Sequence, residues 1–408
     1  MSDQTPRRRA SGAHPIYLTP LGLHTRYMLG AYLRHTLMVT AALMTIALTI
    51  DLWPQVPLLT ARGDGVLFLW DIARLVALRL PDLLPPFVPF AVFLGVVWSE
   101  SAFTESRERM LIWNSGRSPL LCLTPALLAG LVMGVSLFVI DAYLRPAAIH
   151  VQMREVLGRE GIRLDRHQSG GNHWIALPDG LLRAEIEYGP PLRLHNVTIY
   201  KLDTEGHLAE VNTASVAKPL SPGHWLLEEG RYWHADIENR GDTLTTGDHS
   251  VESEVPFRQR TITMTLNVMW LENLGLSPQY LALGDLRTLS RAHIIARDAS
   301  GYRTRLQALY AEPLFTCSMA LLGAALSLLA FAYRTRWYEL VGVLLAGYLA
   351  HFASRAMLLM GEFGYVSSFL AGWLAAMLVC IAVGAVLFVI QKRRGAGIYD
   401  MPHFVDKA

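Results

Sequence analysis

Charged residues are scarce in this chain of 408 residues. Asp, Glu, Lys and Arg together make up 17% of the sequence, whereas hydrophobic residues make up 52%. Soluble domains usually carry about 25% charged residues, so the composition argues against an ordinary soluble enzyme. The formal net charge of +2 is too small to indicate nucleic-acid binding, and we expect no nucleic-acid partner.

Cysteine is scarcer still. Only three cysteines occur, and Cys122, Cys317 and Cys380 all fall inside long apolar segments. The polar residues between those segments contain none. This polar part must therefore fold without disulfides, even if it lies in an oxidising compartment.

Motifs for catalysis and nucleotide binding are also missing. The 14 histidines form no H-E-x-x-H, no serine lies in G-x-S-x-G, and no G-x-x-x-x-G-K-[ST] occurs. The apolar segments carry no evident pair of carboxylates for acid and base work, because Asp51 and Asp141 fall at segment ends, where solvation would explain them. We therefore expect no catalytic residues, no metal and no cofactor, and any energy must come from a separate nucleotidase.

Long apolar runs are what the sequence has instead. A helix needs about 20 apolar residues to cross the hydrocarbon core of a bilayer. Six windows meet this requirement: Ala31 to Leu52, Leu78 to Trp98, Leu120 to Tyr143, Leu309 to Tyr333, Glu339 to Met360 and Val366 to Ile390. The sequence therefore predicts six transmembrane helices in two groups of three, within residues 25–146 and 301–394.

The basic residues predict the orientation of these spans. Positive residues favour the cytoplasmic side of a membrane, so both termini are expected inside, with residues 1–24 and 395–408 as cytoplasmic tails. Arg62 and Arg74, between the first two spans, do not follow this rule. The basic residues that agree with the rule lie before the first span, between the second and third, between the fourth and fifth, or after the sixth: Arg7, Arg8, Arg9, Arg26, Arg107, Arg109, Arg117, Arg334, Arg336, Lys392, Arg393 and Arg394.

The polar insert, residues 147–300, is typical of an all-β domain. Apolar and polar residues alternate in several runs, which suits half-buried strands, and Pro and Gly pairs separate the runs. The runs are Leu192 to Leu202, Leu208 to Ala217, Gly230 to Ile237 and Arg260 to Trp270. Many short strands favour a sandwich, a jelly roll or an open barrel, with a trailing helix expected over Leu281 to Arg297.

A short amphipathic helix is predicted near residues 103–116, between the second and third spans. Charges of both signs at Glu108 and Arg109 precede the apolar Met110, and Gly116 would end the helix. Two interpretations stay open. The helix is either an interfacial connector with solvated charges or a coupling helix that docks into a cytoplasmic motor.

Ionisable residues near the outer ends of the spans form a second set of candidates. His351 and Arg355 are four residues apart and share one helix face, where they would suit phosphate or acidic sugar groups. Alternatively, Arg355 extends to the interface and His351 forms a hydrogen bond within the bundle. Arg145, Arg303 and Arg305 are further candidates of the same kind, whereas Arg34 and His35 are expected to anchor the first span to headgroups.

The chain resembles the LptF/LptG permeases of the lipopolysaccharide export transporter from about Thr25 to Arg394. Glu108 and Gly116 match the family's acidic residue and the glycine eight positions after it. The other matching features are Pro125, Pro146, the strand pattern from Val197 to Leu208, the strand ending at Ala217, Pro313 and Trp373. The exit from the β-domain, Leu276 to Arg291, is more similar to the LptG type. Two features depart from the family pattern: Leu374 follows Trp373 where a proline is usual, and Asp51 stands where some members have a basic residue.

This resemblance implies a multi-pass inner-membrane permease with a periplasmic β-jellyroll. Its implied partners are a cytoplasmic ABC ATPase, a paralogous permease subunit, periplasmic β-jellyroll bridge proteins and lipopolysaccharide itself. Glu108, Arg109, Met110 and Gly116 would contact the ATPase. Two rival classes are an integral-membrane enzyme, opposed by the missing motifs, and a membrane-anchored periplasmic scaffold or sensor, which would need no ATPase.

Overall fold

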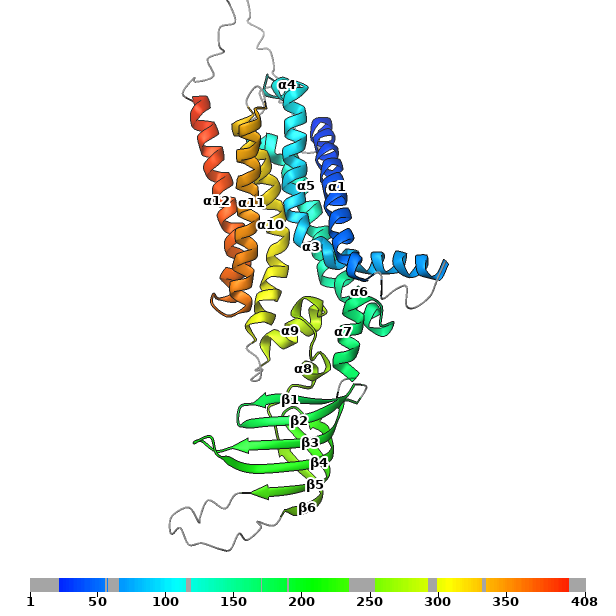
Figure 1. Ribbon diagram of the computed structural model, residues 1–408. Coiled ribbons are helices and arrows are strands. Elements are labelled where there is room, and N and C mark those ends of the chain that lie inside the picture. Colours follow the sequence, from blue (N-terminus) through cyan, green and yellow to red (C-terminus); the bar gives the residue numbers. More distant parts are fainter. Residues whose placement is uncertain are drawn as a thin grey trace, which may run out of the picture.

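The computed structural model describes residues 22–55, 57, 66–114, 119–169, 171–188, 191–234, 254–292, 299–331 and 335–395. Figure 1 shows a bundle of long helices with a curved β-sheet beyond one end and short helices between the two. The expected tails, 1–24 and 395–408, lie almost wholly outside the described residues.

Six helices of the described chain are long and apolar enough to cross a membrane, which agrees with the six predicted spans. Three precede the sheet in the chain and three follow it. They are α1 (Leu23–Leu52), α3 (Val66–Glu105), α5 (Pro119–Val139), α10 (Ser300–Ala330), α11 (Trp337–Glu362) and α12 (Ser368–Gly395).

Helix α3 is much longer than the window Leu78 to Trp98 that the sequence indicated. Its 40 residues correspond to about 60 Å at 1.5 Å per residue. It also contains Pro81, Pro85, Pro86 and Pro89, each of which removes one backbone donor from the helix. Figure 1 shows the first part of α3 running sideways from the bundle before the helix turns along it. This is the bend expected where prolines interrupt the hydrogen-bond ladder.

Several short helices connect the long ones. Helix α4 (Glu108–Asn114) follows α3 through Arg107, whose φ of 62° lies in the left-handed region and turns the chain. Helix α5 continues into a π-helical turn, η2 (Ile140–Leu144), and then into α6 (Arg145–Arg154) and α7 (Gly158–Ser169). A short 3-10 turn, η1 (Trp53–Gln55), ends α1.

Helix α10 lies at the centre of the bundle and packs closely against α5. Gly130 and Gly134 are four residues apart on α5, and their missing side chains allow this approach. A Cβ atom added at Gly134 would lie 2.8 Å from the carbonyl oxygen of Pro313, and one at Gly130 would lie 2.7 Å from the Cα atom of Cys317. The small-residue spacing is visible in the sequence, but only the structure shows which helix it faces.

The sheet is antiparallel, and its six strands pair in sequence order, β1-β2-β3-β4-β5-β6. The alternating runs Leu192 to Leu202 and Leu208 to Ala217 are found in strands, as predicted, and the described part of the run from Gly230 lies in a strand as well. The run Arg260 to Trp270 is a strand only as far as Thr263 and enters a short helix at Val268. Residues 147–169, at the start of the region expected to be β, are mostly helical. This sequential order is an up-and-down meander, and it gives no separate support to a jelly roll. The strands are β1 (Asn172–Leu177), β2 (Gly180–Glu187), β3 (Arg193–Leu202), β4 (Leu208–Ser221), β5 (His224–His234) and β6 (Val255–Thr263).

One face of the sheet holds a packed core. Leu182, Leu194 and Leu227 are fully buried there, and Trp225 is 1% exposed. The chain after β6 covers this core with α8 (Val268–Glu272), η4 (Pro278–Tyr280) and α9 (Leu283–Arg291), the last of which lies within the predicted trailing helix. Apolar side chains on alternate strand positions fill this face, so the domain needs no disulfide.

Candidate functional site

Helix α4 lies at the end of the bundle opposite the sheet (Figure 1). Met110 and Leu111 are 42% and 71% exposed, and Glu108 is half-buried. Arg109 differs from its neighbours because it is only 3% exposed and is directed into the bundle. Gly116, the expected end of the helix, lies outside the described residues.

Arg109 joins α4 to two membrane helices. Its Nη2 atom forms an ion pair with Oε2 of Glu100 on α3, and the hydroxyl of Tyr32 on α1 donates a hydrogen bond to Oε1 of the same carboxylate. Glu100 and Tyr32 are 1% and 0% exposed. A buried ion pair with an added hydrogen bond holds its members in one geometry. A displacement of α4 would therefore also displace α3 and α1.

A second contact between α1 and α3 lies beside this one. His35 was expected to meet headgroups, but its Nδ1 atom lies 2.7 Å from the hydroxyl of Ser99, and its ring stacks on Trp98 at 5.1 Å. The ring therefore packs α1 against α3 near the Arg109 ion pair, and its contact with headgroups stays a prediction.

A chain of buried and half-buried charges crosses the end of the bundle nearer the sheet. It alternates in sign through Asp51, Arg79, Asp82, Arg145, Asp141 and Arg305, and we call these six residues the ionic chain. Successive N–O distances are 2.6, 2.9, 2.7, 3.0 and 2.6 Å. The three carboxylates neutralise the three guanidinium groups, which lowers the free-energy cost of burying these charges in an apolar bundle.

The ionic chain ties helices that are far apart in sequence. Asp51 belongs to α1, Arg79 and Asp82 to α3, Asp141 to η2 and Arg305 to α10. The expectation that Asp141 is solvated at a helix end is wrong, since it is 2% exposed and contacts two arginines. The π-helical turn places Asp141 and Arg145 toward the same neighbours, a local irregularity often found at functional positions.

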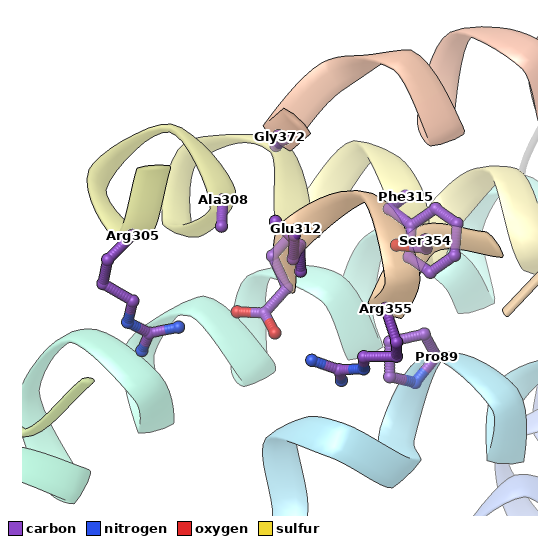
Figure 2. A pocket seen from close by; sticks show the side chains of 10 residues that line it. Pro89, Arg305, Ala308, Glu312, Phe315, Ser354, Arg355 and Gly372 are labelled. Carbon is purple, nitrogen blue, oxygen red and sulfur yellow. The ribbon is translucent and has the colours of Figure 1, made fainter. Parts of the chain in front are cut away.

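A small cavity adjoins the ionic chain between α3, α10, α11 and α12. Figure 2 shows the Glu312 carboxylate between the guanidinium groups of Arg305 and Arg355. The cavity volume of about 40 Å³ would hold two or three waters. Oε2 of Glu312 has no hydrogen-bond partner among the described residues, and Glu312 also lies close enough to Asp141 to interact with it.

Arg355 of α11 forms a hydrogen bond with the backbone of α3. Its Nη2 atom donates a hydrogen bond of 3.0 Å to the carbonyl oxygen of Pro85. That carbonyl would normally accept from the N–H four residues later, but position 89 is also proline and has no N–H. Arg355 therefore satisfies a backbone acceptor that the proline pattern leaves free, as a polar group in an apolar medium requires.

The two remaining candidate contacts for lipid phosphates, His351 and Arg303, have different surroundings. His351 lies between the rings of Phe90 and Phe315, at 5.6 and 6.5 Å, and its Nδ1 atom has no hydrogen-bond partner among the described residues. Arg303 is exposed and donates to the carbonyl oxygen of Ser290 in α9. The structure thus brings Arg145, Arg305 and Arg355 together and leaves Arg303 apart.

Within the described part of the chain, one group has side chains spaced for a metal ion: Asp203, Glu205 and His207, in the exposed turn between β3 and β4. Oδ1 of Asp203 accepts the backbone N–H groups of Glu205 and His207 at 2.9 and 2.8 Å. These bonds form a local turn, so hairpin geometry explains the grouping without an ion.

Six long apolar helices with a β-domain beyond one end define the class of the protein: a multi-pass membrane protein with a large domain outside its helical bundle. The chain belongs to the LptF/LptG family, because the family model "Lipopolysaccharide export system permease LptF/LptG" matches residues 26–389. This match confirms the resemblance and makes the protein an inner-membrane permease of lipopolysaccharide transport. The family model covers both types, so the LptG assignment stays a prediction. No curated protein sequence matches the chain.

Sequence reasoning missed Tyr32, Arg79, Asp82, Glu100 and Glu312. A signal for them existed, because each is a polar or ionisable residue within a long apolar helix, where such residues are costly and usually paired. What the sequence lacked was the partner of each one, since most partners lie on another helix. The i, i+3 spacing of Arg79 and Asp82 was the one local clue.

Proposed function

We propose that this protein is a permease subunit of an ATP-driven complex that extracts lipopolysaccharide from the inner membrane and passes it to a periplasmic bridge. The observation that carries the proposal is the buried Arg109–Glu100 ion pair with Tyr32, which links α4 to α3 and α1. Membership of the permease family supports the lipid substrate.

In this proposal α4 is the coupling helix. A cytoplasmic ABC ATPase contacts Glu108 and the exposed Met110, and Gly116 ends the docking segment. Arg109 acts from the inner side of the same helix as a positioning residue, and it transmits the movement of α4 to α3 and α1. Rigid-body displacement of packed helices is an established way to couple nucleotide hydrolysis to a distant site.

A paralogous permease subunit completes the lipid cavity. Lipopolysaccharide has acyl chains that dissolve in the bilayer and an anionic sugar portion that does not, so extraction needs a cavity that opens sideways. Six helices of one chain supply half of such a cavity. Helix α1, on the flank of the bundle, has exposed apolar residues such as Ile46 and Ile50, which suit either lipid or the second subunit.

The five basic candidates, His351, Arg355, Arg145, Arg303 and Arg305, are proposed contacts for lipid phosphates. Asp82 and Asp141 already neutralise Arg145 and Arg305, so a phosphate would have to compete with these carboxylates. A photocrosslinker at position 351 or 355 of the assembled complex should capture lipopolysaccharide. Consistently empty crosslinking would favour a purely internal role for these residues.

The β-domain is the first stretch of the path outside the membrane. We place it in the periplasm, with both termini in the cytoplasm, on the basis of the basic residues of the sequence. Its strands follow one another away from the bundle, with β6 at the far edge (Figure 1). A bridge protein with a jelly-roll fold could add a strand to that edge, which would extend a jellyroll-like groove.

Charge reversal of Glu108 tests the coupling. Glu108→Arg should abolish co-purification of the ATPase and stop lipid release, with the permease still inserted in the membrane. Glu105→Arg is the matched control, since Glu105 is exposed at the end of α3 and outside α4. ATPase binding and lipid release at wild-type levels in Glu108→Arg would contradict the coupling role and favour a membrane-anchored scaffold or sensor.

A further inference from the structure

The first part of α3 extends beyond what a membrane span requires. A bilayer core about 30 Å thick needs about 20 helical residues, whereas α3 has 40. The apolar window begins near Leu78, so residues 66–77, which we call the α3 arm, are additional. Figure 1 shows this arm running sideways from the bundle near the end of α1.

One face of the α3 arm is apolar and has no protein partner among the described residues. Leu69 and Trp70 are both 65% exposed, and Ala73 and Ala77 are exposed as well. Positions 69, 73 and 77 follow a spacing of four, and position 70 lies beside them, so the four side chains form one stripe along the helix.

The opposite face is anchored. Leu75 is fully buried against Leu157, with Ile72 packed beside them. Arg74 forms an ion pair of 2.5 Å with Glu155, which accounts for an arginine that the positive-inside rule does not explain. The arm is therefore held in a fixed direction, and its apolar stripe stays uncovered by the chain's own described residues.

The bend that directs the arm is also fixed. Arg79 and Asp82 belong to the ionic chain, and Pro81 lies between them. Arg79 makes two hydrogen bonds to Asp51 at the end of α1, at 2.8 and 2.6 Å. The arm consequently leaves the bundle at the level where α1 ends.

Exposed aromatic residues mark that level independently. Trp53 at the end of α1 is 80% exposed, and Phe363 and Tyr365, between α11 and α12, are 75% and 81% exposed. The end of α1 and the connection between α11 and α12 both lie at the sheet-side ends of the spans (Figure 1). Trp and Tyr collect at the boundary between headgroups and acyl chains, so these rings and Trp70 indicate one interface.

We propose that the α3 arm lies flat in the sheet-side interface of the membrane that the six helices span, with Leu69, Trp70, Ala73 and Ala77 in contact with lipid. The occupant of the stripe is the bilayer surface, because the stripe is apolar, is part of a helix that continues into a membrane span, and lies at the level of the exposed aromatic residues. This is how interfacial amphipathic helices bind. The inference concerns membrane contact and does not depend on lipopolysaccharide transport.

Spin-label accessibility tests the arm in the full-length protein. Single cysteines at positions 69 to 77, in a chain whose native cysteines have been replaced, are labelled after reconstitution into phosphatidylethanolamine and phosphatidylglycerol vesicles. Labels at 69, 70, 73 and 77 should collide with oxygen several-fold more than with a water-soluble nickel reagent. The label at 75, which replaces the fully buried Leu75, should be protected from both reagents. Oxygen accessibility along the arm should therefore vary with a period of about 3.6 residues.

Two results would overturn the proposal. Preferential collision of the stripe with nickel would place the arm in water, and protection of the stripe from both reagents would mean that a second copy or another subunit covers it. A substitution gives an independent measurement: Trp70→Glu should raise the nickel accessibility of a label at position 73, whereas Trp70→Phe should leave it unchanged. An equal response to both substitutions would also contradict lipid contact.

Discussion

Nη2 of Arg305 in α10 lies 2.6 Å from Oδ2 of Asp141 in η2, and the other carboxylate oxygen of Asp141 forms an ion pair with Arg145. This contact joins a helix after the β-domain to a segment before it, across more than 160 positions of the chain. The two groups of helices are therefore connected by charge as well as by apolar packing. The ionic chain extends the same connection to α3 and α1.

We expect Asp141→Asn to destabilise the bundle, because the substitution leaves two buried arginines without their shared carboxylate. Breaking a buried ion pair by removing one partner typically costs about 3–5 kcal/mol. Thermal unfolding of the purified protein should show a clearly lower Tm. Asp179→Asn, at an exposed position in the turn after β1, should leave the Tm unchanged. Equal Tm values for the two variants would mean that the ionic chain is not stabilising.

We expect Glu100→Gln to separate ATPase binding from lipid release. The exposed side of α4 is unchanged in this variant, so the ATPase should still co-purify. The ion pair with Arg109 is lost, however, and lipid release per ATP hydrolysed should fall severalfold.

Tyr32→Phe should show a smaller loss of the same kind, since it removes one hydrogen bond, worth about 0.5–1.5 kcal/mol. Tyr27→Phe is its control, because Tyr27 is 57% exposed on the same helix. Full coupling in both Glu100→Gln and Tyr32→Phe would show that α4 does not act through this carboxylate.

We expect Gly134→Ala to loosen the contact between α5 and α10. The added methyl group would lie 2.8 Å from a backbone oxygen of α10, which cannot rotate away as a side chain could. Overpacking of this kind costs about 1–3 kcal/mol. Gly30→Ala on α1 is the matched change, because nothing lies within 4 Å of its added Cβ atom. A lower Tm for Gly134→Ala alone would support the contact, and equal values would contradict it.

We expect the cost of Arg355→Met to depend on Pro89. In the native chain the substitution leaves the Pro85 carbonyl without its donor. In a Pro89→Ala background, the new N–H at position 89 can donate to that carbonyl through the ordinary helical bond. A double-mutant cycle on unfolding free energy should therefore show a smaller loss in the Pro89→Ala background. Strictly additive losses would mean that Arg355 stabilises the bundle in another way.

The sequence predicted the regular elements well where local pattern decides them. The six long helices lie where the apolar windows indicated, and β3 covers almost the same residues as its alternating run. Helix ends were less accurate, since α3 begins 12 residues before the expected Leu78. The arm was missed because Asp71 and Arg74 interrupt its apolar character, and Arg74 is compensated by Glu155, 81 positions later.

The sequence by itself determined that this chain has six helices long and apolar enough to cross a membrane, and a β-domain without cysteine. Hydrocarbon accepts only backbone whose hydrogen bonds are satisfied locally, so length and apolarity alone identify such helices. The tertiary structure alone decided which charges meet. The local pattern of α4 predicts that Arg109 lies on the surface. It lies inside the bundle instead, where it pairs with Glu100 of α3, which also accepts a hydrogen bond from Tyr32 of α1. Pairing across helices depends on their packing, which no local pattern contains.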